Sequence, residues 1–327
     1  MKGGITVQEK PRILAVVGPT ASGKTSLAVE LARLFDGEII CCDSMQIYRE
    51  MSIGTAKPTE EEKCGVPHHL FDIKDPDEPF SAQEYVTLAE QAVQDVLSRG
   101  KLPVFCGGTG LYLDAFLRGG MPETPGADQS IRDELTAFAE ANGADALHAE
   151  LVKVDPESAA IAHPNNLRRV IRALEIYRLT GVTKSEWDRR SKELPSRYNA
   201  AVLGLIFTDR ARLYERIERR VDIMLQDGLL EETRALLDSG VFERSPTAAA
   251  AIGYKELLPF LRGEATLEDA VNELKTATRR YAKRQLTWFG AKDYVRTLVM
   301  DEENGMRKSE QIVNNARALA DSAWNML

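Results

Sequence analysis

The 327-residue sequence contains no apolar run that could cross a membrane and no stretch typical of a secretion signal. A membrane-spanning helix needs about 18 consecutive apolar residues, and no run approaches that length. Residues 1–11 are polar and lack the apolar core of a signal peptide. Cysteine is scarce, and none of the four forms a CxxC pair: Cys41, Cys42, Cys64 and Cys106. We therefore expect a cytoplasmic protein with reduced, buried thiols.

Internal repeats and low-complexity segments are also missing. Hydrophobic residues make up 43% of the chain and charged residues 28%, which is typical of a globular protein. A chain of this length can bury a sizeable core, and it is expected to divide into two domains.

The net charge of −8 argues at first against a nucleic-acid partner, but the positive charges are unevenly placed. Residues 165–200 contain nine Lys or Arg and four Asp or Glu, and residues 275–292 contain six basic residues and no acidic one. An acidic body with two basic patches is typical of a selective polyanion binder. Two solvated helix faces would give the same pattern, so charge alone leaves both interpretations open.

The residues with the clearest chemistry form a GxxxxGK[ST] motif between an apolar run, residues 13–17, and a segment with helical spacing. In that context the backbone N–H groups and the helix N-terminus bind phosphate, the lysine adds a charge, and the Thr25 hydroxyl can hold Mg²⁺. Gly37 is expected to end the helix. The motif consists of Gly18, Pro19, Thr20, Ala21, Ser22, Gly23, Lys24 and Thr25.

Two further buried strands are predicted at residues 38–42 and 102–106. Asp43 follows the first of them, and Thr109, within Gly107-Gly108-Thr109-Gly110, follows the second. The carboxyl ends of parallel strands form the ligand crevice, so both side chains should lie beside the phosphate loop. Asp43 could hold a metal, act as a general base, or only cap a turn. The glycines predict a close backbone approach at Thr109, although a tight turn without a ligand is the alternative.

His68 and His69 lie in a loop-rich stretch, and no further His or Cys stands at metal-ligand spacing. Residues 131–194 show helical periodicity without a buried strand, and residues 202–207 then predict another strand. We therefore expect an α/β fold: a parallel-sheet core of the P-loop NTPase type, formed by residues 1–122 and 200–327 with a helical C-terminal part. A helical insertion domain would occupy residues 123–199.

Basic side chains recur at helical spacing in both patches. Arg168, Arg169 and Arg172 follow Asn165-Asn166 and share one helix face. In the second patch, two i,i+4 pairs stand beside Tyr281 and Trp288, a mixture that suits RNA phosphates and bases. The two pairs are Arg279 with Lys283 and Arg280 with Arg284.

These segments resemble, in order and across nearly the whole chain, the motifs of the bacterial tRNA dimethylallyltransferase (tRNA isopentenyltransferase) family. No motif is missing, and no cysteine follows Cys106 to form the zinc finger of the eukaryotic relatives. The motifs that carry the resemblance are residues 18–25, 43–48, 53–58, 66–70, 107–112, 168–175, 251–255 and 279–285.

The resemblance implies transfer of a dimethylallyl group from dimethylallyl diphosphate to N6 of the adenosine just 3′ of the anticodon, by a monomeric enzyme. It implies that the phosphate loop holds the diphosphate with Mg²⁺, that Thr109 acts near the breaking bond, and that Asp43 removes the N6 proton. Arg220 is expected to contact the diphosphate. The residues implied in tRNA contact are Asp43, Ser44, Met45, Gln46, Thr109, Arg132, Arg168, Arg169 and Arg172; we add Arg279, Arg280, Lys283 and Arg284.

Two other classes remain open at this stage. A small-molecule or nucleotide kinase would use the same loop for ATP, although this chain is longer than such a kinase needs. A non-enzymatic RNA-binding module would explain the basic patches, but it leaves the Asp43 and Thr109 arrangement without a purpose.

Overall fold

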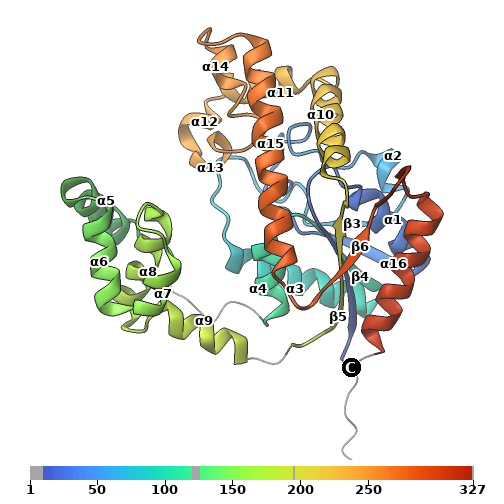
Figure 1. Cartoon of the computed structure of the whole chain (residues 1–327), viewed down its shortest axis with the longest axis horizontal. Helices are drawn as coiled ribbons and strands as arrows, with labels where there is room; N and C mark the ends of the chain where they lie inside the picture. The colour runs from blue at the N-terminus through green and yellow to red at the C-terminus, as the bar shows by residue number, and fades with distance from the viewer. Residues whose placement is uncertain (1–9, 120–125, 194–195, 326–327) are drawn as a thin grey trace, which may run out of the picture. The chain divides into compact units, whose positions relative to one another are not determined.

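The computed structural model describes residues 10–119, 126–193 and 196–325 (Figure 1). A six-stranded sheet forms the centre of the larger of two compact units, with the order β3-β2-β4-β1-β5-β6 and every neighbouring pair parallel. Its strands are β1 (Arg12–Val17), β2 (Gly37–Cys41), β3 (His68–His69), β4 (Leu102–Gly107), β5 (Asn199–Ile206) and β6 (Val295–Val299). A separate antiparallel hairpin consists of β7 (Asp301–Glu302) and β8 (Gly305–Met306). The predicted parallel α/β core is confirmed.

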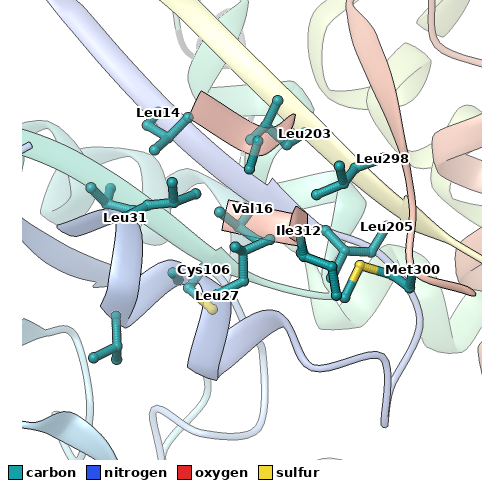
Figure 2. Packing of buried hydrophobic residues seen from close by; sticks show 14 of the residues in the cluster. Leu14, Val16, Leu27, Leu31, Cys106, Leu203, Leu205, Leu298, Met300 and Ile312 are labelled. Atoms are coloured by element: carbon teal, nitrogen blue, oxygen red, sulfur yellow. The ribbon is translucent and has the colours of Figure 1, made fainter. Parts of the chain in front are cut away.

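Helices cover both faces of the sheet because its inner strands are apolar on both sides. On one face, alternate residues of β1, β4 and β5 pack against α1 (Lys24–Leu34) and α16 (Ser309–Trp324), as Figure 2 shows. On the other face, Phe105 of β4 contacts Phe116 of α4 (Gly110–Leu117), with ring centroids 4.6 Å apart, and α3 (Ala82–Ser98) packs beside α4. Packing on both faces fixes the positions of the strands, and with them their carboxyl ends, which the predicted site residues follow.

A second cluster of buried side chains forms the helical C-terminal part of the core. Tyr48 and Met51, which follow β2, pack there among residues of the later helices, so this part is joined to the segment after Asp43. Its helices are α10 (Arg210–Gln226), α11 (Leu229–Asp238), α12 (Val241–Arg244), α13 (Pro246–Ala249), α14 (Leu258–Leu261) and α15 (Leu267–Gly290). The short α2 (Glu60–Lys63) lies in the loop-rich stretch before β3.

The insertion is a compact unit of its own. Its helices are α5 (Gln129–Asn142), α6 (Ala144–Val154), α7 (Pro156–Ile161), α8 (Leu167–Thr180) and α9 (Lys184–Glu193), and they enclose a small apolar core. The unit extends over Arg118–Ser196, whereas the linker pattern placed it at residues 123–199. The difference has a physical cause: Tyr198 stacks on Phe116 with centroids 5.3 Å apart, and Asn199 already pairs with Arg12 in the sheet.

Gly37 does not end the first helix, as the sequence had led us to expect. Helix α1 ends at Leu34, and the N–H of Phe35 donates to the carbonyl of Leu31 at 2.9 Å. Gly37 is instead the first residue of β2, where a Cβ atom would lie 2.6 Å from the Leu102 carbonyl oxygen. Its small size serves close strand packing. Within the described residues, no helix has the length and apolar character needed to cross a membrane.

Candidate active site

The phosphate loop connects the carboxyl end of β1 to the first turn of α1. Gly18 has φ of 142°, and a Cβ atom there would stand 2.9 Å from the carbonyl oxygen of Leu205 in β5. Gly23, with φ of 90°, is the N-cap of α1. Glycine adopts both conformations without strain, so the loop closes tightly over the helix N-terminus. The free N–H groups of that first turn form a site for an anion.

Lys24 and Arg220 bring two positive charges to this loop. The Nζ of Lys24 donates a hydrogen bond to the Pro19 carbonyl at 2.6 Å. Burial lowers the pKa of Lys24 to about 8; the nearby Arg220 adds to this effect, while Cys106 and Asp43 oppose it. Burial also lowers the pKa of Arg220. Within the described residues, no carboxylate forms an ion pair with either side chain, so both cations remain available to an anion.

The ends of β2 and β4 bring Asp43 and Thr109 together, as the parallel-sheet rule predicted. The Thr109 N–H donates to the Cys42 carbonyl at 3.1 Å, and its Oγ1 accepts from the Ser44 N–H at 3.0 Å. Asp43 Oδ1 accepts from the Met45 N–H at 2.9 Å. Thus the turn role considered for Asp43 is present. Because that bond uses Oδ1, and no described residue donates to Oδ2, the turn does not exclude a chemical role.

The glycines around Thr109 allow close approach to other parts of the chain itself. A Cβ atom at Gly107 would lie 2.0 Å from the Cys42 carbonyl oxygen. At Gly108 it would lie 2.0 Å from Nε2 of Gln285, and at Gly110 it would lie 2.1 Å from Nε1 of Trp288. The loop is therefore pressed between β2 and α15, which leaves the Thr109 hydroxyl directed toward Ser44.

A cavity of about 280 Å³ at the carboxyl ends of the strands is lined by Lys24, Asp43 and Arg220, whereas Thr109 lies next to Ser44 and is not among its lining residues. Its charged lining near the phosphate loop comes from Lys24, Asp43 and Arg220, and further polar residues line it as well: Thr20, Thr25, Ser44, Gln46, Thr55, His68, Thr247, Thr278, Tyr281, Arg284 and Gln285. An apolar part of the lining comes mainly from the segment after β2 and from the C-terminal helices. The main apolar contributors are Met45, Phe71, Ile217, Val221, Met224, Ala251, Ile252 and Leu274.

Two motifs far apart in sequence form one wall of this cavity. The carboxylate of Glu232 accepts hydrogen bonds from the backbone N–H groups of Ser52, Ile53 and Gly54 at 2.9–3.0 Å. It also accepts one from the Tyr254 hydroxyl at 2.7 Å. A Cβ atom at Gly54 would lie 2.4 Å from the Tyr254 ring. The loop at residues 53–58 is thus held against the motif at residues 251–255.

Gln46, predicted to contact tRNA, also forms hydrogen bonds with this loop. Its Nε2 donates to the carbonyls of Thr55 and Ala56, both at 3.0 Å. Ser44, Met45 and Gln46 all line the cavity together with Asp43. The structure therefore gathers all four predicted residues of this segment at one place.

The two adjacent histidines have different surroundings. Nε2 of His69 lies 2.7 Å from Oε2 of Glu38, a buried carboxylate that also accepts from Arg99. His68 lines the cavity, its Nδ1 lies 2.7 Å from the Val66 carbonyl oxygen, and burial lowers its pKa. Across the described ranges, no group of three or more His, Cys, Asp and Glu residues could hold a metal. The histidines do not form a metal centre.

The C-terminal basic residues divide into paired and unpaired side chains. Arg279 donates to Glu218 at 2.5 Å, and Arg280 lies 3.6 Å from Glu273. Arg284 lines the cavity, with its guanidinium 5.4 Å from the centroid of the Tyr281 ring. Lys283 is exposed, and no acidic partner for it exists in the described part of the chain. The four predicted tRNA contacts on α15 therefore differ in how freely they can reach a ligand.

The insertion shows a similar division. Arg132 and Arg172 both donate to Glu175, whose side chain is fully buried, at 2.7–3.1 Å. Arg168 and Arg169 stand exposed in the first turn of α8, and neither has an acidic partner among the described residues. The predicted arginine face therefore contains one side chain bound to the fold and two that extend into solvent.

Three site residues were not found by sequence reasoning: Arg216, Glu232 and Gln285. The Nε of Arg216 donates to the Ala21 carbonyl of the phosphate loop at 2.8 Å. Gln285 contacts both loops of the site, and Glu232 holds the wall described above. Two sequence signals could have identified two of these residues. Gln285 is the last residue of the motif at residues 279–285, and Arg216 stands one helical turn before Arg220.

The chain is similar to known proteins over most of its length. A family model described as IPP transferase matches residues 46–292. The tRNA dimethylallyltransferase of Halalkalibacterium halodurans is 49% identical over 305 residues, which are 93% of this chain and 96% of that protein.

Two solved structures are also similar. The tRNA isopentenylpyrophosphate transferase of Bacillus halodurans superposes with a TM-score of 0.68 at 45% identity, covering 98% of this chain and 99% of that one. A eukaryotic dimethylallyltransferase acting on tRNA gives a TM-score of 0.76 at 33% identity, covering 88% of this chain and 74% of that one. The chain therefore belongs to the IPP transferase family, which includes the tRNA dimethylallyltransferases.

Proposed function

We propose that this chain transfers a dimethylallyl group from dimethylallyl diphosphate to N6 of the adenosine on the 3′ side of the anticodon in tRNA, releasing diphosphate. The observation that carries the proposal is one cavity in which an anion-binding loop, two unpaired cations, a carboxylate and an apolar wall meet. Membership of the IPP transferase family supports the same reaction. Because tRNA is the acceptor, we place the reaction in the cytoplasm.

The donor occupies the side of the cavity next to the phosphate loop. The N–H groups at the start of α1, Lys24 and Arg220 bind the diphosphate. Ile217, Val221 and Met224 offer the five-carbon tail an apolar surface. Negative charge accumulates on the diphosphate as its bond to the allylic carbon breaks. Fixed positive charges in a partly buried site stabilise that charge without reorganising, which lowers the barrier.

Asp43 acts on the acceptor. An exocyclic amine is a poor nucleophile and must lose a proton when it is alkylated, so the reaction needs a base within hydrogen-bond reach. Asp43 lines the cavity, and its Oδ1 is held by the Met45 N–H, which fixes the carboxylate. Thr109 Oγ1 contacts Ser44, the residue after Asp43. We assign its hydroxyl to a hydrogen bond near the bond that breaks. The adenine must leave its stack to reach this point.

Magnesium fits the donor side of the cavity. The oxygen donors there are the Thr25 hydroxyl and the Asp43 carboxylate, too few to hold the ion alone. Mg²⁺ commonly keeps several waters and takes its other oxygens from substrate phosphates, so this set suits an ion that binds with the diphosphate. Bound there, Mg²⁺ would supply positive charge to the leaving diphosphate.

The tRNA backbone is contacted by exposed basic residues that no carboxylate neutralises. Arg168 and Arg169 of the insertion and Lys283 of α15 meet this description. Arg280 forms an exposed ion pair with Glu273 at 3.6 Å, which a phosphate could replace, and Arg284 lies at the cavity itself. We assign these side chains to phosphate contacts, which add affinity without reading sequence.

One assay tests the proposal against the other two classes. Purified protein is incubated with dimethylallyl diphosphate labelled in the prenyl group, or with ATP labelled at the γ-phosphate, each with and without tRNA. We expect prenyl label in tRNA at the adenosine beside the anticodon and no release of phosphate from ATP. Steady ATP turnover that increases with an acceptor would instead establish a kinase. Binding of tRNA without transfer of either label would establish a binding module.

A further inference from the structure

Gln285 joins the phosphate loop to the loop that carries Thr109. Its side chain projects from α15 and is only 5% exposed. Oε1 accepts a hydrogen bond from the Thr20 N–H at 2.8 Å, and Nε2 donates to the Gly108 carbonyl at 3.0 Å. A backbone N–H can only donate and a carbonyl can only accept, so these partners fix which way the amide points.

The position of this amide in the sheet explains its importance. The last residue pair between β1 and β4 is Val17 with Gly107. Beyond this pair each strand continues into its own loop, the phosphate loop after β1 and the Thr109 loop after β4. Gln285 bonds to both of them just past that point. A Cβ atom at Gly108 would lie 2.0 Å from its Nε2 and 3.7 Å from the Gly18 carbonyl oxygen. The two loops and the amide are therefore in direct contact, with no room for another side chain.

We propose that Gln285 is a positioning residue that fixes the diphosphate-binding loop relative to Thr109, and hence to Asp43. The inference rests on the proposed function, since it assigns the leaving group to one loop and the catalytic hydroxyl to the other. Gln285 does not itself touch the reacting atoms in this assignment. A misplacement of about 1 Å between reacting groups can cost a factor of about 10² in rate, so the bridge contributes to turnover rather than to tRNA affinity.

Two substitutions of Gln285 test its hydrogen bonds, one to the Thr20 N–H and one to the Gly108 carbonyl. Gln285→Glu keeps an acceptor for the Thr20 N–H but turns a second acceptor toward the Gly108 carbonyl. Gln285→Met keeps the length and loses both hydrogen bonds. The control is Asn199→Leu: Asn199 is also 5% exposed, and its Nδ2 donates to the Trp324 carbonyl at 2.9 Å at the amino end of β5, away from the site.

Prenyl transfer is measured for each protein at a temperature where it is folded, with kcat and the KM for tRNA determined separately. We expect kcat to fall about 10²-fold for Gln285→Met and about tenfold for Gln285→Glu, with the KM for tRNA within about threefold of wild type. Asn199→Leu should lose stability but keep its kcat. A kcat within twofold of wild type for both Gln285 variants would overturn the proposal. So would an equal loss in Asn199→Leu, or failure of both Gln285 variants to fold while Asn199→Leu folds.

A second measurement does not depend on activity. Inorganic diphosphate is added to wild type and to Gln285→Glu, and hydrogen exchange is followed at the backbone amides of residues 108–110. We expect diphosphate to slow the exchange of these amides in wild type. In Gln285→Glu the exchange should be the same with and without diphosphate, at a concentration that saturates the phosphate loop. Equal slowing in both proteins would show that the bridge does not couple the loops. If wild type lacks prenyl transfer, the proposed function fails, while this experiment still tests the coupling.

Discussion

Positive side chains have opposite surroundings in the cavity and in the insertion: those of the cavity lack a carboxylate partner in the part of the chain that the structure describes, and two of those in the insertion share one. In the cavity, Lys24 and Arg220 have no carboxylate partner among the described residues. In the insertion, Arg132 and Arg172 share the fully buried Glu175. A cation withdrawn from water without a partner is costly, so its persistence indicates a ligand site, whereas a paired cation indicates a fold contact. The local surroundings of an arginine therefore tell more about its task than the basic patch that contains it.

The largest effect is expected on the cavity side, at Asp43. Asp43→Ala removes the proposed base while leaving the phosphate loop and the arginines in place. Turnover should fall by about 10²–10⁴-fold because general-base catalysis contributes that much. The measurement is single-turnover prenyl transfer together with tRNA affinity, which should stay within a few-fold of wild type. Near-normal turnover in this variant would remove Asp43 from the role.

On the insertion side, Glu175→Gln tests whether the paired arginines belong to the fold. It removes the charge that two partly exposed guanidinium groups share, and losing such charge-assisted hydrogen bonds costs about 1–3 kcal/mol. Hydrogen exchange should show α5 and α8 losing protection while the core sheet keeps its own. The matched control is Glu134→Gln, which removes the partner of Arg178 at the surface, where ion pairs contribute little. Equal loss of protection in both variants would contradict the assignment.

The pH dependence of diphosphate binding tests whether the charge of Lys24 contributes to the affinity of the cavity for an anion. Its pKa is lowered to about 8, so the free protein loses the Lys24 charge as the pH rises through that value. The charged form binds diphosphate, so the contribution of Lys24 to affinity should be full at about one pH unit below 8. Above pH 8 the affinity should fall by up to about tenfold per pH unit. Calorimetry with inorganic diphosphate measures this. Lys24→Arg stays charged, so its affinity should not show the same decline; parallel curves would assign the decline to another group.

The smallest effect is expected at the exposed arginines of the insertion. Replacing Arg168 and Arg169 with glutamine should weaken tRNA binding and reduce the slope of log affinity against log salt by about one to two units. Turnover at saturating tRNA should barely change, because such contacts bind ground and transition states alike. Arg178→Gln, at a paired surface position, is the control. An unchanged slope in the double variant would mean that these side chains are only solvated.

The parts of the site that sequence could predict follow from local chemistry and one rule of topology. The phosphate loop is a contiguous motif, and Asp43 and Thr109 each follow a buried strand. Parallel strands bring such ends to one edge, so their meeting could be expected without knowing the strand order. Strand order itself, with β1 between β4 and β5, depends on packing of segments across the whole chain.

The parts that sequence could not predict involve partners far apart in the chain. Gln285 bonds to Thr20, 265 positions away, and Glu232 bonds to Gly54, 178 positions away. No periodicity signals such pairs. Strands β3 and β6 were also missed, because β3 has two residues and β6 is only partly buried, so neither forms an apolar run. The pairing of Arg132 and Arg172 with Glu175 was hidden because spacing shows which side chains share a face, not which are neutralised.

The order of the strands in the sheet also determines when the sheet can be completed during synthesis of the chain. Strand β1 needs β4 on one side and β5 on the other, and the whole insertion separates those two strands in the chain. At about 5–20 residues per second, a ribosome takes on the order of 4–16 s to make these roughly 80 residues. Throughout that interval the apolar edge of β1 lacks its second neighbour, and an unpaired edge invites pairing with other chains. The insertion, which has its own core, can fold during the delay, while the sheet must wait for residue 199 to emerge.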